Sequence, residues 1–235
     1  MTAAEIIAEL KPLGRESYKN VMLKHGAKEP LFGVKIEDLK KIQKRIKKDY
    51  QLTLELYDTG IYEAMYLAGL IADNAKMTKK DLQTWVERAS SYPLAEYTVP
   101  WVAAESPHGW ELALKWIDSK KESIASSGWA TLSSLVAVKD DSQLDLDEIV
   151  ALLERVAKTI HKQPNRARYT MNGFIISVGG YVEPLTDLAK MTARKIGKVV
   201  VEMGETTCQV PDALGYIQKM EARGSIGKKR KTARC

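Results

Sequence analysis

The sequence has few of the residues on which disulfide, metal and redox chemistry depend. Its 235 residues include two cysteines, Cys208 and Cys235, which are too few for a disulfide framework and form no CxxC pair. Its three histidines are far apart in the chain, and none has a second ligand type at the spacing of a zinc site. We therefore expect free thiols, no bound metal and no cofactor.

Several catalytic and targeting signals are also missing. No GxSxG, HExxH or GxGxxG motif occurs. No apolar run approaches the roughly 18 residues that a membrane span needs. The N-terminal stretch "MTAAEIIAELKPLG" lacks the basic and apolar regions of a signal peptide. We expect a cytoplasmic protein without membrane contacts.

What is present is an uneven distribution of charge. The net charge of +6 divides into +5 over residues 1–50, −8 over residues 51–150 and +9 over residues 151–235. Clustered cations release counterions when they meet a polyanion, so basic ends around an acidic middle favour nucleic acid as the partner. An acidic docking surface on a protein-binding scaffold is the alternative from another functional class.

Helical periodicity dominates the rest of the chain. Residues 36–48 and 148–161 each have an apolar stripe opposite charged residues, and capping signals stand at Thr2, Thr78 and Asp145. We predict an all-α fold of HEAT-like helical repeats stacked as a curved α-solenoid, with a compact bundle as the alternative. At most one short strand is expected, in the valine run near residues 198–203. The predicted organisation is one domain over residues 1–224 and a basic C-terminal tail over residues 225–235.

Two segments carry candidate binding residues. "SSYPLAEYTVPW" interrupts the helical pattern with two prolines, which we expect to turn Tyr92, Tyr97 and Trp101 outward beside Glu96. "KQPNRARY" places Arg166 and Arg168 at a predicted helix start, where free backbone N–H groups favour an anion. Aromatic rings suit stacking on bases, and the arginines suit phosphate.

The C-terminal tail supplies five further candidate phosphate contacts. It reads "GSIGKKRKTARC" and contains no acidic residue. Its cations end the third of the chain that carries +9, so we expect an auxiliary phosphate clamp. They are Lys228, Lys229, Arg230, Lys231 and Arg234.

Three stretches together resemble a known family. They are "LFGVKIEDLKKIQKRIKK", "WIDSKKESIASSGWATLSSL" and "GYIQKMEARGSIGKKRKTARC". Together they are similar to the AlkD-like HEAT-repeat proteins of DNA alkylation repair, over nearly the whole chain. The resemblance implies a concave basic groove for duplex DNA. In active members aromatic side chains and a carboxylate stabilise the oxocarbenium character that develops as a cationic alkylated purine departs.

This chain departs from that pattern at two implied positions. The catalytic aspartate position falls at or near Tyr97, so Glu96 is the nearest carboxylate, and Tyr92 and Phe174 can stand for the groove aromatics. The implied phosphate-binding arginine falls near Gly128 and Trp129, where no arginine occurs.

Three functions follow from these features. The first is binding of damaged, branched or otherwise distorted duplex DNA, with catalytic activity left open. The second is an alkylpurine DNA glycosylase that uses Glu96, and the third is the protein-binding scaffold.

Overall fold

The computed structural model describes residues 1–234, within which all regular secondary structure is helical; Cys235 lies outside the described residues. The first half contains α1 (Ala3–Leu10), α2 (Glu16–Lys24), α3 (Ile36–Ile46), α4 (Tyr50–Asp58), α5 (Tyr62–Ile71), α6 (Lys79–Arg88) and α7 (Val99–Ala104). The second half contains α8 (Gly109–Trp116), α9 (Glu122–Val138), α10 (Leu146–Thr159), α11 (Asn165–Tyr181), α12 (Thr186–Ile196) and α13 (Ala213–Ala222).

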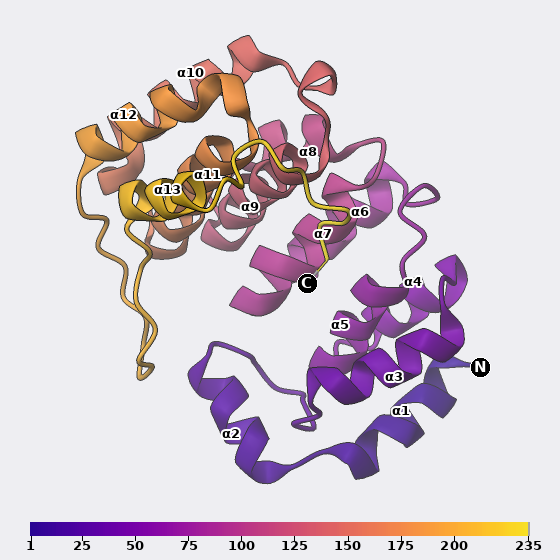
Figure 1. The fold of residues 1–235 in the computed structure, drawn as a ribbon. Coiled ribbons are helices and arrows are strands. Elements are labelled where there is room, and N and C mark those ends of the chain that lie inside the picture. The colour runs from indigo at the N-terminus through magenta and orange to yellow at the C-terminus, as the bar shows by residue number, and fades with distance from the viewer. Residues whose placement is uncertain (235) are drawn as a thin grey trace.

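The helices stack in pairs along an arc (Figure 1). Helices α4, α6, α8 and α12 each pack against the helix next to them in an inner row, which comprises α5, α7, α9, α11 and α13. Successive members of that inner row also contact one another. This arrangement is a curved solenoid of helix pairs rather than a compact bundle, and its inner row forms the concave face.

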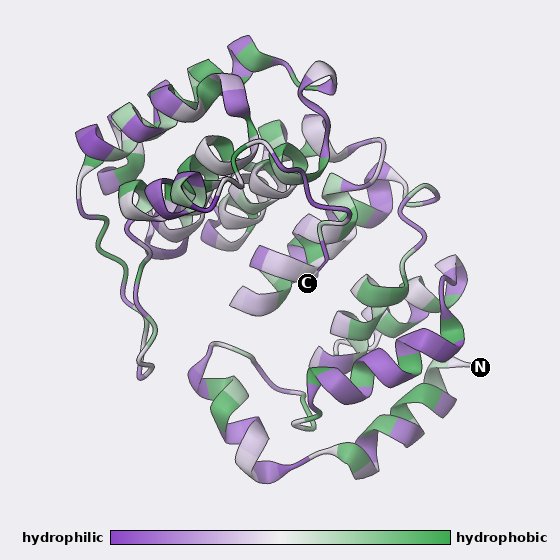
Figure 2. Cartoon of the chain, in the orientation of Figure 1, coloured by the Kyte–Doolittle hydropathy of each residue, from purple (hydrophilic) through white to green (hydrophobic). Residues whose placement is uncertain are grey.

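The sequence signals for helix ends and helix faces are confirmed. Thr2 and Thr78 form capping boxes with Glu5 and Asp81, and the Asp145 carboxylate accepts a hydrogen bond from the Glu148 N–H. Figure 2 shows α3 with hydrophilic and hydrophobic stripes along its length. None of the helices within residues 1–234 has the length and apolar content needed to cross a bilayer.

The valine run between α12 and α13 is an extended connection and forms no strand. Val199 and Val201 are buried, whereas Val200 between them is exposed. The run has the alternation of a strand, but it is not paired with a neighbouring strand, so no ladder forms. The connection over residues 197–212 projects from the body towards α2 (Figure 1).

One buried carboxylate organises the loop before α3. The side chain of Glu63 on α5 accepts hydrogen bonds from the backbone N–H groups of Phe32, Gly33 and Val34, at 2.7–3.1 Å. Gly33 has a φ of 81°, and a Cβ there would collide with the carbonyl oxygen of Arg15. The "FGV" element is therefore a backbone turn wrapped around a carboxylate.

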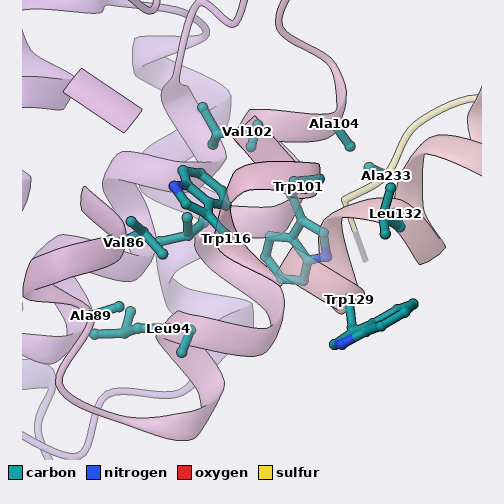
Figure 3. Packing of buried hydrophobic residues seen from close by; sticks show 14 of the residues in the cluster. Val86, Ala89, Leu94, Trp101, Val102, Ala104, Trp116, Trp129, Leu132 and Ala233 are labelled. Carbon is teal, nitrogen blue, oxygen red and sulfur yellow. The ribbon is translucent and has the colours of Figure 1, made fainter. Parts of the chain in front are cut away.

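The hydrophobic core is continuous from Ile6 in α1 to Ala233 beside the C-terminus. Figure 3 shows Trp101, Trp116 and Trp129 in this cluster, with Ala233 among them. Ala233 is 1% exposed, so this residue of the predicted tail belongs to the core.

We predict that Glu63→Gln destabilises the fold. The neutral amide cannot accept from three N–H groups as a carboxylate does, and we expect the free energy of unfolding to fall by about 2–3 kcal/mol in urea titrations. Glu87→Gln, at an exposed position on α6, is the matched control and should change it by less than about 0.5 kcal/mol. Equal effects of the two substitutions would contradict this role for Glu63.

Candidate nucleic-acid interface

The helical interruption predicted at the two prolines is a π-helical turn, Leu94–Thr98, that leads directly into α7. Pro100 has no N–H to donate to the carbonyl of Glu96, and its ring crowds that carbonyl, which favours the wider turn. The turn leaves Tyr97 41% exposed and Tyr92, just before it, 44% exposed. Trp101 is only 4% exposed, so the expectation that all three aromatics turn outward is wrong for Trp101.

Glu96 and Arg166 form a buried ion pair at the centre of the concave face. The Arg166 Nε and Nη2 groups donate to the two Glu96 carboxylate oxygens at 2.7 and 2.5 Å. The side chains are 9% and 2% exposed for Arg166 and Glu96. Both carboxylate oxygens are therefore bonded to the same guanidinium.

The charges of this pair are compensated by each other. Burial raises the pKa of the Glu96 carboxyl, and the hydrogen bonds and positive charge of Arg166 oppose that rise. Burial alone would lower the pKa of Arg166, but hydrogen bonds to Glu96 and its negative charge outweigh this and raise it. Arg166 is therefore positively charged, and its charge is paired with that of Glu96.

Two tyrosine rings enclose the same guanidinium. Its central carbon lies 4.6 Å from the centroid of the Tyr92 ring and 4.4 Å from that of Tyr169, which are cation–π distances. The Arg166 Nη1 also lies 3.7 Å from the sulfur of Met203 in the projecting connection. The Arg166 side chain is 9% exposed among these contacts, so it is not the exposed group that its place in the sequence suggests.

The start of α11 does bind an anion, and that anion is a side chain of the protein itself. The backbone N–H of Arg166 donates to the Glu122 carboxylate at 2.7 Å. The predicted affinity of this helix N-terminus for negative charge is thus satisfied internally. Arg168, two residues on, is partly buried and donates to the Asn165 side chain at 3.2 Å.

The C-terminal segment, residues 224–234, crosses the C-terminal ends of four inner helices. Gly227 donates to a carbonyl of α11, Arg230 to a carbonyl of α9, and Ala233 to the carboxylate of Glu105 after α7. Arg234 then reaches α5, where it donates to the carbonyl oxygens of Gly69 and Ala72. Helix C-termini expose unpaired carbonyls and a partial negative charge, so cations are favoured there.

The five cations of this segment divide into two groups. Lys229 donates to the Val136 carbonyl at 2.9 Å and pairs with Asp141, and Arg234 is held by α5, Asn74 and Glu105. These two residues stabilise the fold. The other three are exposed to solvent along the segment: Lys228, Arg230 and Lys231.

Two of the cavities on the concave face share Tyr97 and Tyr169 in their linings. The first, of about 480 Å³, lies between the end of α2, the projecting connection and the Glu96–Arg166 pair, and includes Lys24 and His25. The second, of about 300 Å³, lies between α9, α11, α13 and the C-terminal segment. We call the second cavity the tyrosine pocket; it is lined by Tyr97, Tyr169, Tyr181 and Tyr216, with Trp101 among its apolar residues.

Comparison with known proteins identifies the family of this chain. A family model described as DNA alkylation repair enzyme matches residues 6–189. The chain belongs to this DNA alkylation repair family. It is 32% identical to the uncharacterized protein Lin0241 of Listeria innocua and 31% identical to the uncharacterized protein Lmo0209 of Listeria monocytogenes. Each alignment covers 95% of this chain and 99% of the relative.

A solved structure shows the same fold. It is described as a new family of proteins related to the HEAT-like repeat DNA glycosylases with affinity for branched DNA structures. The TM-score is 0.92 at 37% identity, and the match covers 100% of both chains. The predicted HEAT-like solenoid is thereby confirmed.

The family resemblance implies an arginine near Gly128, and the packing of α9 shows why that position has none. A Cβ on Gly128 would lie 2.7 Å from the backbone nitrogen of Ile117 and 3.0 Å from the carbonyl oxygen of Ala113. Helices α8 and α9 are too close there for any side chain. Trp129 and Phe174 are buried against each other in the core, with ring centroids 5.4 Å apart.

Sequence reasoning missed three residues of this interface. Tyr169 completes the ring pair around Arg166, Glu122 occupies the start of α11, and Glu105 receives the C-terminal segment. The partners of Glu122 and Glu105 lie 44 and 128 residues away, so no local pattern pointed to them. Tyr169 follows Arg166 by three residues on α11, and residues at this spacing are neighbours on a helix, so the sequence could have predicted their contact.

We predict that Arg166→Met strongly destabilises the protein, because it leaves the Glu96 carboxylate buried without its partner. The free energy of unfolding should fall by about 3–5 kcal/mol. The double variant Glu96→Gln with Arg166→Met should lose less than Arg166→Met alone, since no uncompensated charge remains. Urea unfolding followed by circular dichroism measures both.

The exposed pair Arg88–Asp58 provides the control. Arg88→Met should cost less than about 1 kcal/mol, because solvent screens that pair. A cost for Arg166→Met no larger than this would show that the buried pair does not organise the site.

Proposed function

We propose that this protein binds branched or otherwise distorted duplex DNA on its concave face, at the chromosome, and that it does not excise bases. One observation supports the proposal that the protein does not excise bases. Both oxygens of Glu96 accept hydrogen bonds from Arg166, and the carboxylate side chain is 2% exposed. An anion that stabilises a developing oxocarbenium ion must face the sugar, and this one faces a guanidinium instead.

The DNA-binding part is supported by charge and by shape. Lys228, Arg230 and Lys231 are exposed along the C-terminal segment beside the concave face, and Tyr97 is exposed at its centre. A solenoid presents such a face to an extended ligand. The structural relative with a TM-score of 0.92 is described as having affinity for branched DNA structures.

We predict salt-sensitive DNA binding that depends on these three cations. Each phosphate contact contributes about 0.9 to the slope of log affinity against log salt concentration, so replacing all three by glutamine should flatten the slope by about 2–3. Anisotropy titrations of a labelled three-way junction and of linear duplex, at several salt concentrations, measure this slope. Substitution is preferred to truncation because truncation also removes Ala233 and Arg234, which pack into the fold.

The matched control removes the same charge from the outer layer. Lys158 and Lys195 lie on α10 and α12, and Lys162 follows α10; all three are exposed. Their triple glutamine variant should retain the slope of the unmodified protein. If both triple variants lose affinity equally, net charge rather than this surface drives binding, and the absence of any binding at low salt would overturn the proposal.

The family model is described as a DNA alkylation repair enzyme, and the solved relative is described as related to the HEAT-like repeat DNA glycosylases, which makes base excision the second candidate function. We predict that incubation with duplex DNA containing N7-methylguanine releases no free base above the spontaneous rate, as measured by chromatography of the supernatant. Enzymatic release that Glu96→Gln abolishes would show instead that the ion pair opens and that Glu96 is catalytic. Enzymatic release that Glu96→Gln leaves unchanged would reject both the proposal that the protein does not excise bases and the assignment of Glu96 as the catalytic residue.

A further inference from the structure

The tyrosine pocket has a composition suited to a planar heterocyclic ligand. Four of its lining residues are tyrosines, and Trp101, Ala130, Ile176 and Met220 supply apolar surface. Tyr216 is 51% exposed, so its ring is open to a ligand. The volume of the tyrosine pocket, about 300 Å³, is at the lower end for ligand pockets. It fits one ring system and is too small for a helix.

The polar groups of the pocket suit an edge that carries both donors and acceptors. Ser134 and Ser177 line it, and neither hydroxyl has a hydrogen-bond partner among the contacts that the structure gives within residues 1–234. A hydroxyl can donate or accept, so it can satisfy any of the four bases.

The charge at the pocket suits a ligand attached to phosphate. Glu96 is the acidic residue that lines it, and Arg166 neutralises that carboxylate. The exposed cation Arg230 lines the pocket from the C-terminal segment, and Lys231 follows it. A base in the pocket would therefore carry its backbone phosphate towards positive charge.

We propose that the tyrosine pocket receives one unpaired base of the DNA, stacked on its tyrosines, without regard to which base it is. This inference rests on the proposed DNA binding and adds to it a site that distinguishes branched from fully paired DNA. Bulges and incompletely paired branch points hold bases that are already unpaired, so the energetic cost of removing a base from the stack is small there. Aromatic stacking tolerates every base because each has a π-face.

Gly173 offers a direct means to close the pocket. It lies in α11 and lines the cavity, and a Cβ built on it meets no atom within 4 Å. Gly173→Leu fills this space, whereas Gly173→Ala leaves most of it open. Both substitutions favour the helical state, so both variants should fold.

The test compares two DNAs that differ only in the base. One duplex carries a single extruded adenosine, and the other carries an abasic tetrahydrofuran residue at the same place. Stacking of one base predicts at least about fivefold tighter binding of the first DNA by the unmodified protein and by Gly173→Ala. Gly173→Leu should bind both DNAs with the affinity of the abasic duplex, and Tyr216→Ala should reduce the preference.

Three results would overturn the inference. Equal affinity of the unmodified protein for both DNAs would show that no base is bound, while DNA binding itself would stand. A preference that persists in Gly173→Leu would place the base elsewhere on the concave face. No binding to either duplex at low salt would remove the proposed function as well.

Discussion

The buried pair of Glu96 and Arg166 is the interaction on which the concave face depends. Two charges taken out of water require compensation from every side, and the protein supplies it with two tyrosine rings on the guanidinium and with Glu122 on the adjoining backbone. The pair ties the π-helical turn to the start of α11. It thereby sets the position of Tyr97 and Tyr169, which line two of the cavities on this face.

Most of the fold was accessible from the sequence because its signals are local. Capping boxes, amphipathic stripes and proline breaks act within one or two helical turns, and these predictions are confirmed at Thr2, Thr78 and the turn before Pro100. The valine run near residue 200 shows the limit of such signals. Its alternation is that of a strand, yet a strand exists only where a neighbouring strand pairs with it.

The candidate site was accessible only in part, because it depends on contacts between distant residues. The sequence placed Tyr92, Glu96 and Arg166 in the site, and the structure brings them together. The same contacts assign Glu96 and Arg166 to each other rather than to a ligand. The cations of the C-terminal segment also have two different roles. Lys229 and Arg234 bind helix carbonyls, whereas Lys228 and Lys231 are exposed, and a count of charges in the sequence does not distinguish these two groups.

The course of the C-terminal segment has a consequence for how the molecule unfolds. In a solenoid each helix pair touches only its neighbours, so the two ends of the array can fray independently. Here Arg234 is bonded to a carbonyl 165 residues earlier in the chain, and the segment contacts α11, α9, α7 and α5 in turn. This contact ties the C-terminal segment to α5, so we expect the helices from α5 to α13 to unfold as one cooperative unit.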